Sequence, residues 1–130
     1  MLVGQIEMEE HSTIGIEKMV QSRLRVTWGE SIALGPGKAE LLELVDQTGS
    51  IAEAAKRMDM SYMRAWTLIR TMNGCFKEPL VDSVRGGSKG GGATLTASGR
   101  EVLSLYRQME RDCEKASLNV WPSLSKLLKD

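Results

Sequence analysis

Two helical patterns of unequal length lie close together in the middle of the chain. The first covers residues 51–58 and the second covers residues 61–73, each with apolar residues at helical spacing. Ser50 and Glu53 have the spacing of a capping box, in which each side chain accepts a hydrogen bond from the other residue's backbone N–H. Residues 59–60 leave room only for a tight turn. A short capped helix, a turn and a second helix are therefore predicted over this stretch.

The flanking sequence predicts a helix before this pair and a hairpin after it. The preceding helix is expected over residues 36–47. The glycine-rich residues 86–92 cannot form regular structure, because glycine loses more backbone entropy on folding than any other residue. Further predicted elements are strands at 23–28, 32–34, 80–85 and 93–95 and a long helix from residue 96 or 98 to residue 120. This order is typical of a winged helix-turn-helix, a mainly α fold with a small β-hairpin wing.

Length and composition favour one domain without a metal site. A chain of 130 residues suits one domain with an appended element. Cys75 and Cys113 belong to no CxxC or Cys/His cluster and His11 is the only histidine, so we expect no metal and no cofactor. The sequence lacks a signal peptide and an apolar membrane span, which favours a cytoplasmic protein. We expect an acidic N-terminal arm at 1–22, a winged helix-turn-helix domain at 23–96, and a dimerisation helix with a C-terminal tail at 97–130.

Positive charge is concentrated in one segment although the chain as a whole is neutral. Its 17 Lys and Arg balance 17 Asp and Glu. Residues 51–95 nevertheless carry seven basic and four acidic side chains, a net charge of +3, whereas residues 1–22 are acidic. Because basic surfaces attract the phosphate backbone, this distribution favours nucleic-acid binding by the segment that holds the two central helices.

One face of the predicted helix 61–73 suits a DNA major groove. Its inward face is expected to hold Ala65, Ile69 and Met72, with Tyr62 at the edge and Trp66 packing between the faces. The opposite face is rich in Arg, Thr and small residues, and comprises Met63, Arg64, Thr67, Arg70, Thr71 and Gly74. Arginine can bond guanine bidentately and a threonine methyl can touch the thymine methyl. We therefore expect base contacts from Arg64, Thr67 and Arg70, with Thr71 beside them.

The start of this helix and the glycine tract are expected to contact the DNA backbone. Ser61 and Tyr62 lie at the N-terminal end of the helix, where phosphate binds readily, and Lys56 can add a further contact. The tract 86–92 carries Lys89 and follows Arg85, so it resembles a wing whose bare backbone approaches phosphates or a minor groove. The alternatives are an ordinary solvated helix face and a hairpin loop without a partner. A nucleotide-binding loop is excluded, since no glycine tract has the Gly-Lys-Ser/Thr ending.

The long C-terminal helix carries an apolar seam that predicts a dimer. Its members are spaced 4-3-4-3-4, and they are Val102, Tyr106, Met109, Cys113, Ala116 and Val120. A helix of this length has more apolar face than a small domain can cover, so pairing with a second copy is expected. The alternative is packing on the helix's own domain, which we expect in part for Leu103, Leu105 and Tyr106.

Several of these stretches together resemble the N-terminal DNA-binding domain of ModE-type molybdenum-responsive regulators, a LysR-like winged helix. The shared features, which lie between residues 24 and 120, are Gly49-Ser-Ile-Ala-Glu-Ala-Ala-Lys56, Met60-Ser-Tyr-Met-Arg-Ala-Trp66, Met72-Asn73, Pro79-Leu-Val81, the glycine tract, Leu95-Thr96, Gly99 and Leu105-Tyr106. The resemblance implies a dimeric transcription factor with helix 61–73 and wing 86–92 on double-stranded DNA. Full-length members continue into a separate molybdate-binding domain, for which these 130 residues have no room. We therefore carry over only DNA binding, and we do not expect molybdate binding.

Two other classes of function are alternatives to a DNA-binding regulator. A winged-helix scaffold that binds proteins and has no specific DNA site is the alternative, and the acidic residues 1–22 give it some support. An enzyme is disfavoured, because the sequence shows no nucleophile–base pair, metal cluster or cofactor loop.

Overall fold

The computed structural model describes residues 17–84 and 92–130, which belong to two compact units. One unit is Arg23–Arg111, and the other combines residues up to Ser22 with Asp112–Asp130. No helix in the described part of the chain is long and apolar enough to cross a membrane.

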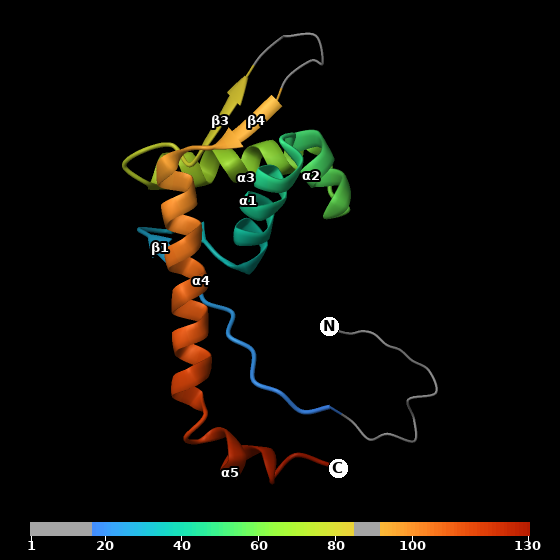
Figure 1. Cartoon of the computed structure of the whole chain (residues 1–130), viewed down its shortest axis with the longest axis vertical. Helices are drawn as coiled ribbons and strands as arrows, with labels where there is room; N and C mark the ends of the chain where they lie inside the picture. Colours follow the sequence, from blue (N-terminus) through green and yellow to red (C-terminus); the bar gives the residue numbers. More distant parts are fainter. Residues whose placement is uncertain (1–16, 85–91) are drawn as a thin grey trace. The chain divides into compact units, whose positions relative to one another are not determined.

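The elements follow the predicted order, with two small antiparallel hairpins among the helices (Figure 1). They are β1 (Val26–Trp28), β2 (Ser31–Leu34), α1 (Pro36–Thr48), α2 (Ile51–Arg57), α3 (Tyr62–Cys75), β3 (Val81–Val84), β4 (Gly92–Leu95), α4 (Ala97–Ser117) and α5 (Trp121–Ser125). In the second hairpin Val81 pairs with Leu95 and Val84 pairs with Gly92. In Figure 1, α1, α2 and α3 are grouped next to this hairpin, and α4 begins directly after β4.

Local capping sets the boundaries of α1 and α2. Gly49 ends α1 in the left-handed region (φ 69°), and its N–H donates to the Val45 carbonyl. Ser50 Oγ then accepts a hydrogen bond from Glu53 N at 3.0 Å and starts α2. The predicted capping box is only half formed, because the Ser50 N–H donates to Thr48 Oγ1 at 3.2 Å and so has no need of the Glu53 carboxylate.

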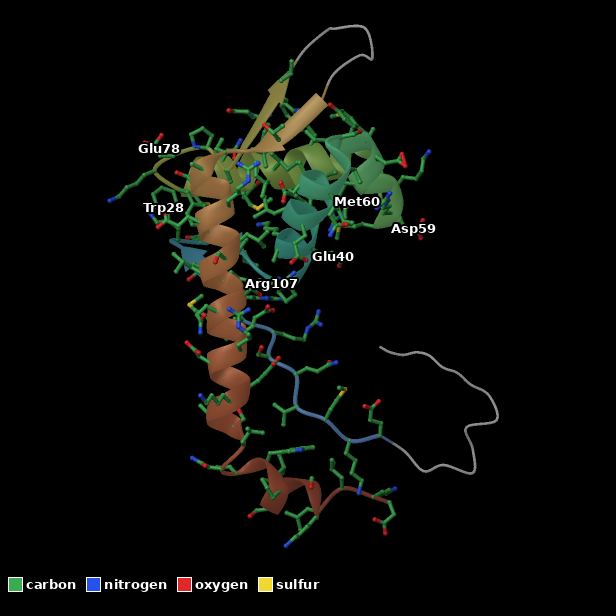
Figure 2. The ribbon with its side chains drawn as sticks, viewed as in Figure 1. Trp28, Glu40, Asp59, Met60, Glu78 and Arg107 are labelled. Carbon is green, nitrogen blue, oxygen red and sulfur yellow. The ribbon has the colours of Figure 1, made fainter. Side chains whose placement is uncertain are left out.

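The turn between α2 and α3 covers residues 58–61, because α2 ends one residue earlier and α3 begins one residue later than predicted. Asp59 adopts a φ of 57°, a conformation that Asp tolerates better than most residues, and Figure 2 shows Asp59 and Met60 together at this turn. Ser61 caps α3 by accepting from Arg64 N at 3.1 Å. The helix runs two residues beyond the predicted end at residue 73, through Cys75, and its C-cap Phe76 is extended.

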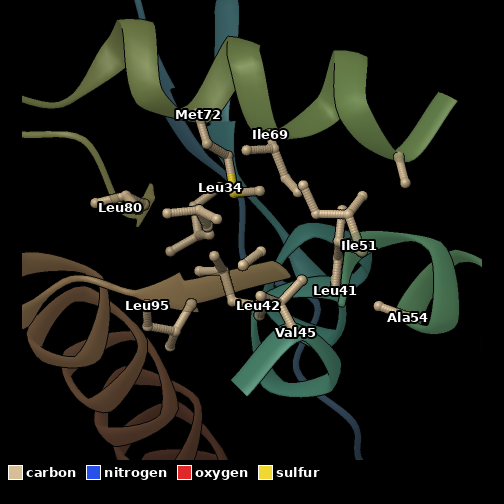
Figure 3. Close-up of a cluster of buried hydrophobic side chains, with 14 of the residues drawn as sticks. Leu34, Leu41, Leu42, Val45, Ile51, Ala54, Ile69, Met72, Leu80 and Leu95 are labelled. Atoms are coloured by element: carbon tan, nitrogen blue, oxygen red, sulfur yellow. The ribbon is translucent and has the colours of Figure 1, made fainter. Parts of the chain in front are cut away.

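Aliphatic side chains from α1, α2, α3 and the hairpin form one core in the Arg23–Arg111 unit. Figure 3 shows Leu34, Leu41, Leu42 and Val45 facing Ile69 and Met72 of α3, with Leu80 and Leu95 beside them. Ala65, Ile69 and Met72 are all buried, so the predicted inward face of α3 is confirmed. This packing determines which face of α3 remains outside.

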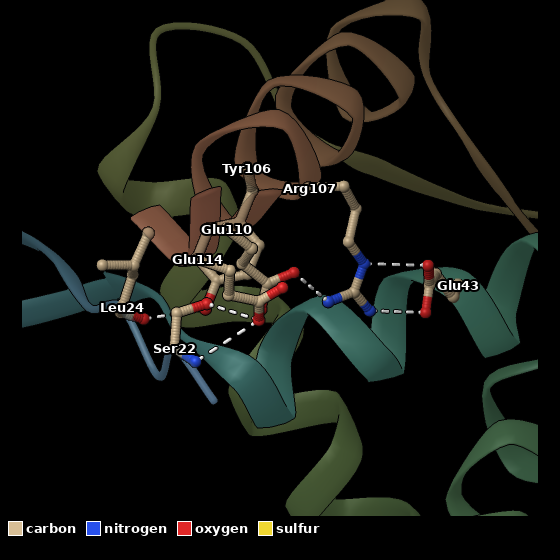
Figure 4. Close-up of polar contacts among 7 residues, drawn as sticks. All are labelled: Ser22, Leu24, Glu43, Tyr106, Arg107, Glu110 and Glu114. Atoms are coloured by element: carbon tan, nitrogen blue, oxygen red, sulfur yellow. Dashed lines mark hydrogen bonds and ion pairs between the residues drawn. The ribbon is translucent and has the colours of Figure 1, made fainter. Parts of the chain in front are cut away.

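Tyr106 belongs to this core, which confirms that it packs on its own domain and removes it from the predicted dimer seam. Its side chain is 1% exposed, and its hydroxyl donates to the Leu24 carbonyl at 2.7 Å (Figure 4). Burial is the main reason that the pKa of the Tyr106 hydroxyl is raised. Leu105 is 58% exposed, contrary to the expectation that it packs partly on the domain. The exposed apolar residues on this part of α4 are therefore Leu105 and Met109.

An ion-pair network fastens α4 to α1. Arg107 Nε donates to Glu43 Oε2 at 3.0 Å, and Arg107 Nη1 donates to Glu110 Oε1 at 2.8 Å (Figure 4). The hydrogen bond to Glu43 is the largest cause of a raised pKa for the guanidinium, so Arg107 stays charged throughout the accessible pH range. No sequence pattern pointed to this pairing of residues 64 positions apart.

Polar contacts hold the base of the β3–β4 hairpin. Asn73 Oδ1 accepts from Leu80 N at 2.8 Å and from Val81 N at 3.3 Å, and Asn73 Nδ2 donates to the Val81 carbonyl at 3.2 Å. Thr96 N donates to the Leu80 carbonyl at 2.9 Å. The regular strand begins at Val81, one residue later than predicted.

The second unit is smaller and more exposed. Ser22 Oγ donates to Glu114 Oε2 at 3.1 Å, and Lys18 pairs with Asp130 at 3.6 Å. The long helix ends at Ser117 instead of residue 120, so the predicted seam residue Val120 lies outside α4. Pro122 lies in the first turn of α5, where the missing N–H costs nothing. Cys113 and Ala116 are exposed on α4.

Candidate nucleic-acid interface

The outward face of α3 is a continuous exposed surface. Ser61, Tyr62, Met63, Arg64, Thr67 and Arg70 are all exposed, whereas Thr71 is half-buried. The core therefore leaves Arg64, Thr67 and Arg70 on the surface together, as the sequence predicted, and Thr71 partly withdrawn from it. This surface can enter a groove without unfolding any part of the core.

The two threonines present methyl groups more than hydroxyl protons. Thr67 Oγ1 donates to the Met63 carbonyl at 2.8 Å, and Thr71 Oγ1 donates to the Thr67 carbonyl at 3.0 Å. Each hydroxyl proton is thereby used within α3, a common arrangement for threonine in a helix. What Thr67 offers to a partner is its methyl group and an acceptor lone pair, which suits an apolar contact with thymine.

The two arginines of this face have no acidic partner within residues 17–84 and 92–130. Arg64 and Arg70 form no ion pair there. The guanidinium of Arg70 lies over the Trp66 ring, with 5.0 Å between its central carbon and the ring centroid. Trp66 itself is half-buried and packs against the core, as expected. The N–H groups of a guanidinium lie in its own plane, so a guanidinium placed over an aromatic ring can still donate hydrogen bonds from its edge. Arg70 is therefore oriented by Trp66 and still able to bind a partner.

Lys56 is less available than the two arginines. Its Nζ lies 3.9 Å from Glu53 Oε2, one turn earlier on α2, although its side chain is largely exposed. A surface pair of this length is weak, so Lys56 can still exchange Glu53 for a phosphate.

A pocket of about 330 Å³ separates this face from the β3–β4 hairpin. We call it the hairpin pocket. It is lined by Ser50, Ile51, Ala52, Tyr62, Trp66, Ser83, Val84 and Gly92. Tyr62 and Trp66 were predicted to lie beside the exposed face of α3, and Ser50 to cap α2. No local pattern reveals that β3 lies opposite α2 and brings Ser83 to the same pocket.

The predicted wing contacts Arg85 and Lys89 fall outside the described residues. The hairpin is described up to Val84 and again from Gly92, where it is paired in regular antiparallel register. No group of His, Cys, Asp and Glu that could hold a metal ion occurs among the described residues.

The comparisons with known proteins agree with this geometry. Residues 37–100 match the family described as "Bacterial regulatory helix-turn-helix protein, lysR family". The chain carries a LysR-type helix-turn-helix domain of the ModE kind. It is 40% identical over 95 residues to the "Molybdenum transport protein ModE" of Azotobacter vinelandii, covering 73% of this chain and 35% of that protein.

Other ModE proteins show the same partial coverage. The "Transcriptional regulator ModE" of Haemophilus influenzae is 34% identical, with 76% of this chain and 39% of that protein covered. The "DNA-binding transcriptional dual regulator ModE" of Escherichia coli (strain K12) is 37% identical, with 62% and 31% covered. The chain therefore spans about a third of the length of the curated relatives it matches.

A solved structure supports the winged-helix fold. The "Crystal structure of CbnR_DBD-DNA complex" superposes with a TM-score of 0.52 at 18% identity, covering 68% of this chain and 95% of that chain. This similarity confirms the mainly α fold with a hairpin wing.

Proposed function

We propose that this chain is a sequence-specific DNA-binding transcriptional regulator that works as a homodimer in the cytoplasm, by binding and not by catalysis. The observation that carries the proposal is the exposed face of α3, where Arg64 and Arg70 have no acidic partner among the described residues. The printed functions of the ModE relatives support it. In a dimer, each α3 enters a major groove, with half-sites about 34 Å apart or a multiple of that distance.

The residues divide into two roles. Arg64, Thr67 and Arg70 contact base edges, with Thr71 contributing at the margin of the face. A second set positions the protein on the sugar–phosphate backbone, and it comprises Ser61, Tyr62, Lys56, Arg85 and Lys89. Ser61 Oγ accepts the capping bond from Arg64 N, which leaves its own proton free for a phosphate oxygen.

Replacing Arg64 by alanine tests the base contact. Arg64→Ala is expected to weaken binding to a duplex selected from random sequence by about 1–3 kcal/mol and to relax discrimination at one base pair.

Replacing Lys89 by alanine tests the backbone contact. Lys89→Ala should weaken binding to all sequences alike and reduce the salt slope by about one unit. Fluorescence anisotropy at several salt concentrations measures both quantities.

The exposed Arg25, which precedes β1, supplies a matched control. Arg25→Ala removes the same charge and should leave base discrimination unchanged. Wild-type affinity in both the Arg64 and the Lys89 variants would refute the assignment of roles. A wild-type protein without salt-sensitive binding to any duplex would refute DNA binding itself and favour a protein-binding scaffold.

The dimer is expected to use the exposed face of α4. Leu105 is 58% and Met109 is 42% exposed one turn apart, and Val102 is half-buried beside them. Leu105→Glu should convert a dimer to monomers at micromolar concentration, because it places a charge in an apolar contact. Sedimentation velocity measures the change. Met63→Glu is the control, since Met63 is 65% exposed on α3, away from α4's face, and an equal loss of dimer there would contradict this surface.

A further inference from the structure

The hairpin pocket presents hydrogen-bond donors from three separate elements. The hydroxyls of Tyr62 on α3 and Ser83 on β3 form no hydrogen bond within residues 17–84 and 92–130. Ser50 Oγ, at the cap of α2, accepts from Glu53 N, so its own proton is still available to donate. No described Asp or Glu lines the pocket. The polar part of the lining therefore suits an anionic oxygen and disfavours a cation.

The rest of the lining is apolar and includes the Trp66 side chain. Ile51, Ala52 and Val84 contribute aliphatic surface, and Gly92 contributes bare backbone. Tyr62 is 49% and Val84 is 58% exposed, so the pocket is open to a partner from outside. A ligand that fits has an anionic group joined to a compact apolar ring or chain.

The position of the pocket identifies which ligand has this chemistry. It lies between α3, the proposed major-groove element, and the hairpin, the proposed element for the neighbouring groove. On a duplex, two neighbouring grooves are separated by one sugar–phosphate strand. Whenever α3 and the hairpin occupy adjacent grooves, that strand must cross the space between them.

We propose that the hairpin pocket binds the sugar–phosphate backbone of the DNA strand between the two grooves. The hydroxyls of Ser50, Tyr62 and Ser83 donate to the oxygens of a phosphate, and Val84 packs against the deoxyribose. This inference rests on the proposed function and extends it, because it assigns Ser50 and Ser83 to DNA and makes the pocket a backbone site. The contact reads no sequence, and it fixes the register of α3 on the duplex.

Removing the donors tests the chemistry. Tyr62→Phe and Ser83→Ala are each expected to weaken binding to every duplex by about fivefold, since each deletes one hydrogen bond to a charged oxygen. The discrimination between matched and mismatched duplexes should not change. The salt slope should also stay at its wild-type value, because a hydroxyl neutralises no phosphate. Both residues are exposed, and thermal unfolding checks that the variants remain folded.

Filling the pocket tests its location. Ala52 is exposed in the first turn of α2 and lines the pocket, so Ala52→Leu should obstruct the strand and reduce binding by at least about tenfold. Ala97 is likewise an exposed alanine in the first turn of a helix, α4, and does not line the pocket. Ala97→Leu is the matched control and should bind as the wild type does.

Replacing single phosphates of the duplex by a neutral analogue tests the chemistry and the location of the contact together. Methylphosphonate placed at one backbone position at a time should weaken the wild type most at one position per half-site, and the Tyr62→Phe/Ser83→Ala double variant should lose that penalty. Two results would refute the backbone site while leaving the proposed function intact, provided that the wild type binds DNA. One is a double variant with the same methylphosphonate scan as the wild type, and the other is normal binding by Ala52→Leu. A wild type that binds no duplex overturns both.

Discussion

Replacing Gly99 with alanine is expected to destabilise the Arg23–Arg111 unit by about 3 kcal/mol or more, at the upper end of the effect of overpacking. A Cβ on Gly99 would lie 2.1 Å from the carbonyl oxygen of Leu80 and 3.0 Å from its carbonyl carbon. Both partners are backbone atoms, so no side chain can rotate away. The start of α4 would have to move off the base of the hairpin, and the Thr96–Leu80 hydrogen bond would be lost with it.

Urea unfolding followed by circular dichroism measures this loss, and Gly74→Ala is its matched control. Gly74 also lies in a helix, and a Cβ there would meet nothing within 4 Å. Alanine at residue 74 should therefore stabilise the protein by up to about 1 kcal/mol through helix propensity. Equal stability of the two alanine variants would show that α4 does not approach Leu80 this closely.

Asn73→Ala is the second large expected effect, a loss of about 2–3 kcal/mol. The Asn73 side chain accepts from Leu80 N and Val81 N, whose residues are 0% and 5% exposed. Truncation leaves both N–H groups without that acceptor in a place that water does not reach easily. The cost is the desolvation of those groups, which exceeds the net value of a hydrogen bond.

Asn73→Asp separates the role of the acceptor from that of the donor. An aspartate keeps the acceptor for the two N–H groups and replaces the Nδ2 donor by an oxygen facing the Val81 carbonyl, 3.2 Å from Nδ2 in the native protein. It should lose less stability than Asn73→Ala in the same urea experiment. The exposed Asn119 is the control, and its replacement by alanine should change the unfolding free energy by less than about 0.5 kcal/mol. If Asn73→Ala behaved like Asn119→Ala, the hairpin would not depend on this clamp.

Much of the fold could be predicted because its signals are local. The spacing of Ala65, Ile69 and Met72 is enough to orient α3, since residues one turn apart share a face whatever the helix packs against. The caps at Ser50 and Ser61 depend on residues three positions away. Both kinds of signal act within one or two helical turns, so they are visible in the sequence.

The misassigned seam shows where local reasoning stops. Tyr106 and Leu105 are both apolar neighbours on α4, and the heptad spacing favoured Tyr106 for a partner. The structure buries Tyr106 in the core, where its hydroxyl donates to the Leu24 carbonyl, 82 residues earlier in the chain. Nothing in the spacing of α4 reports where Leu24 lies.

The sequence by itself determined the order of the elements, the inward face of α3 and the choice of Arg64, Thr67 and Arg70 as an outward set. Only the tertiary structure decided that Asn73 clamps the hairpin, that Gly99 must lack a side chain, and that Ser50 and Ser83 share a pocket. Helical periodicity and capping arise from interactions between near neighbours, whereas these three features arise when α3, the hairpin and α4 dock, and docking depends on the shapes of all the packed side chains together.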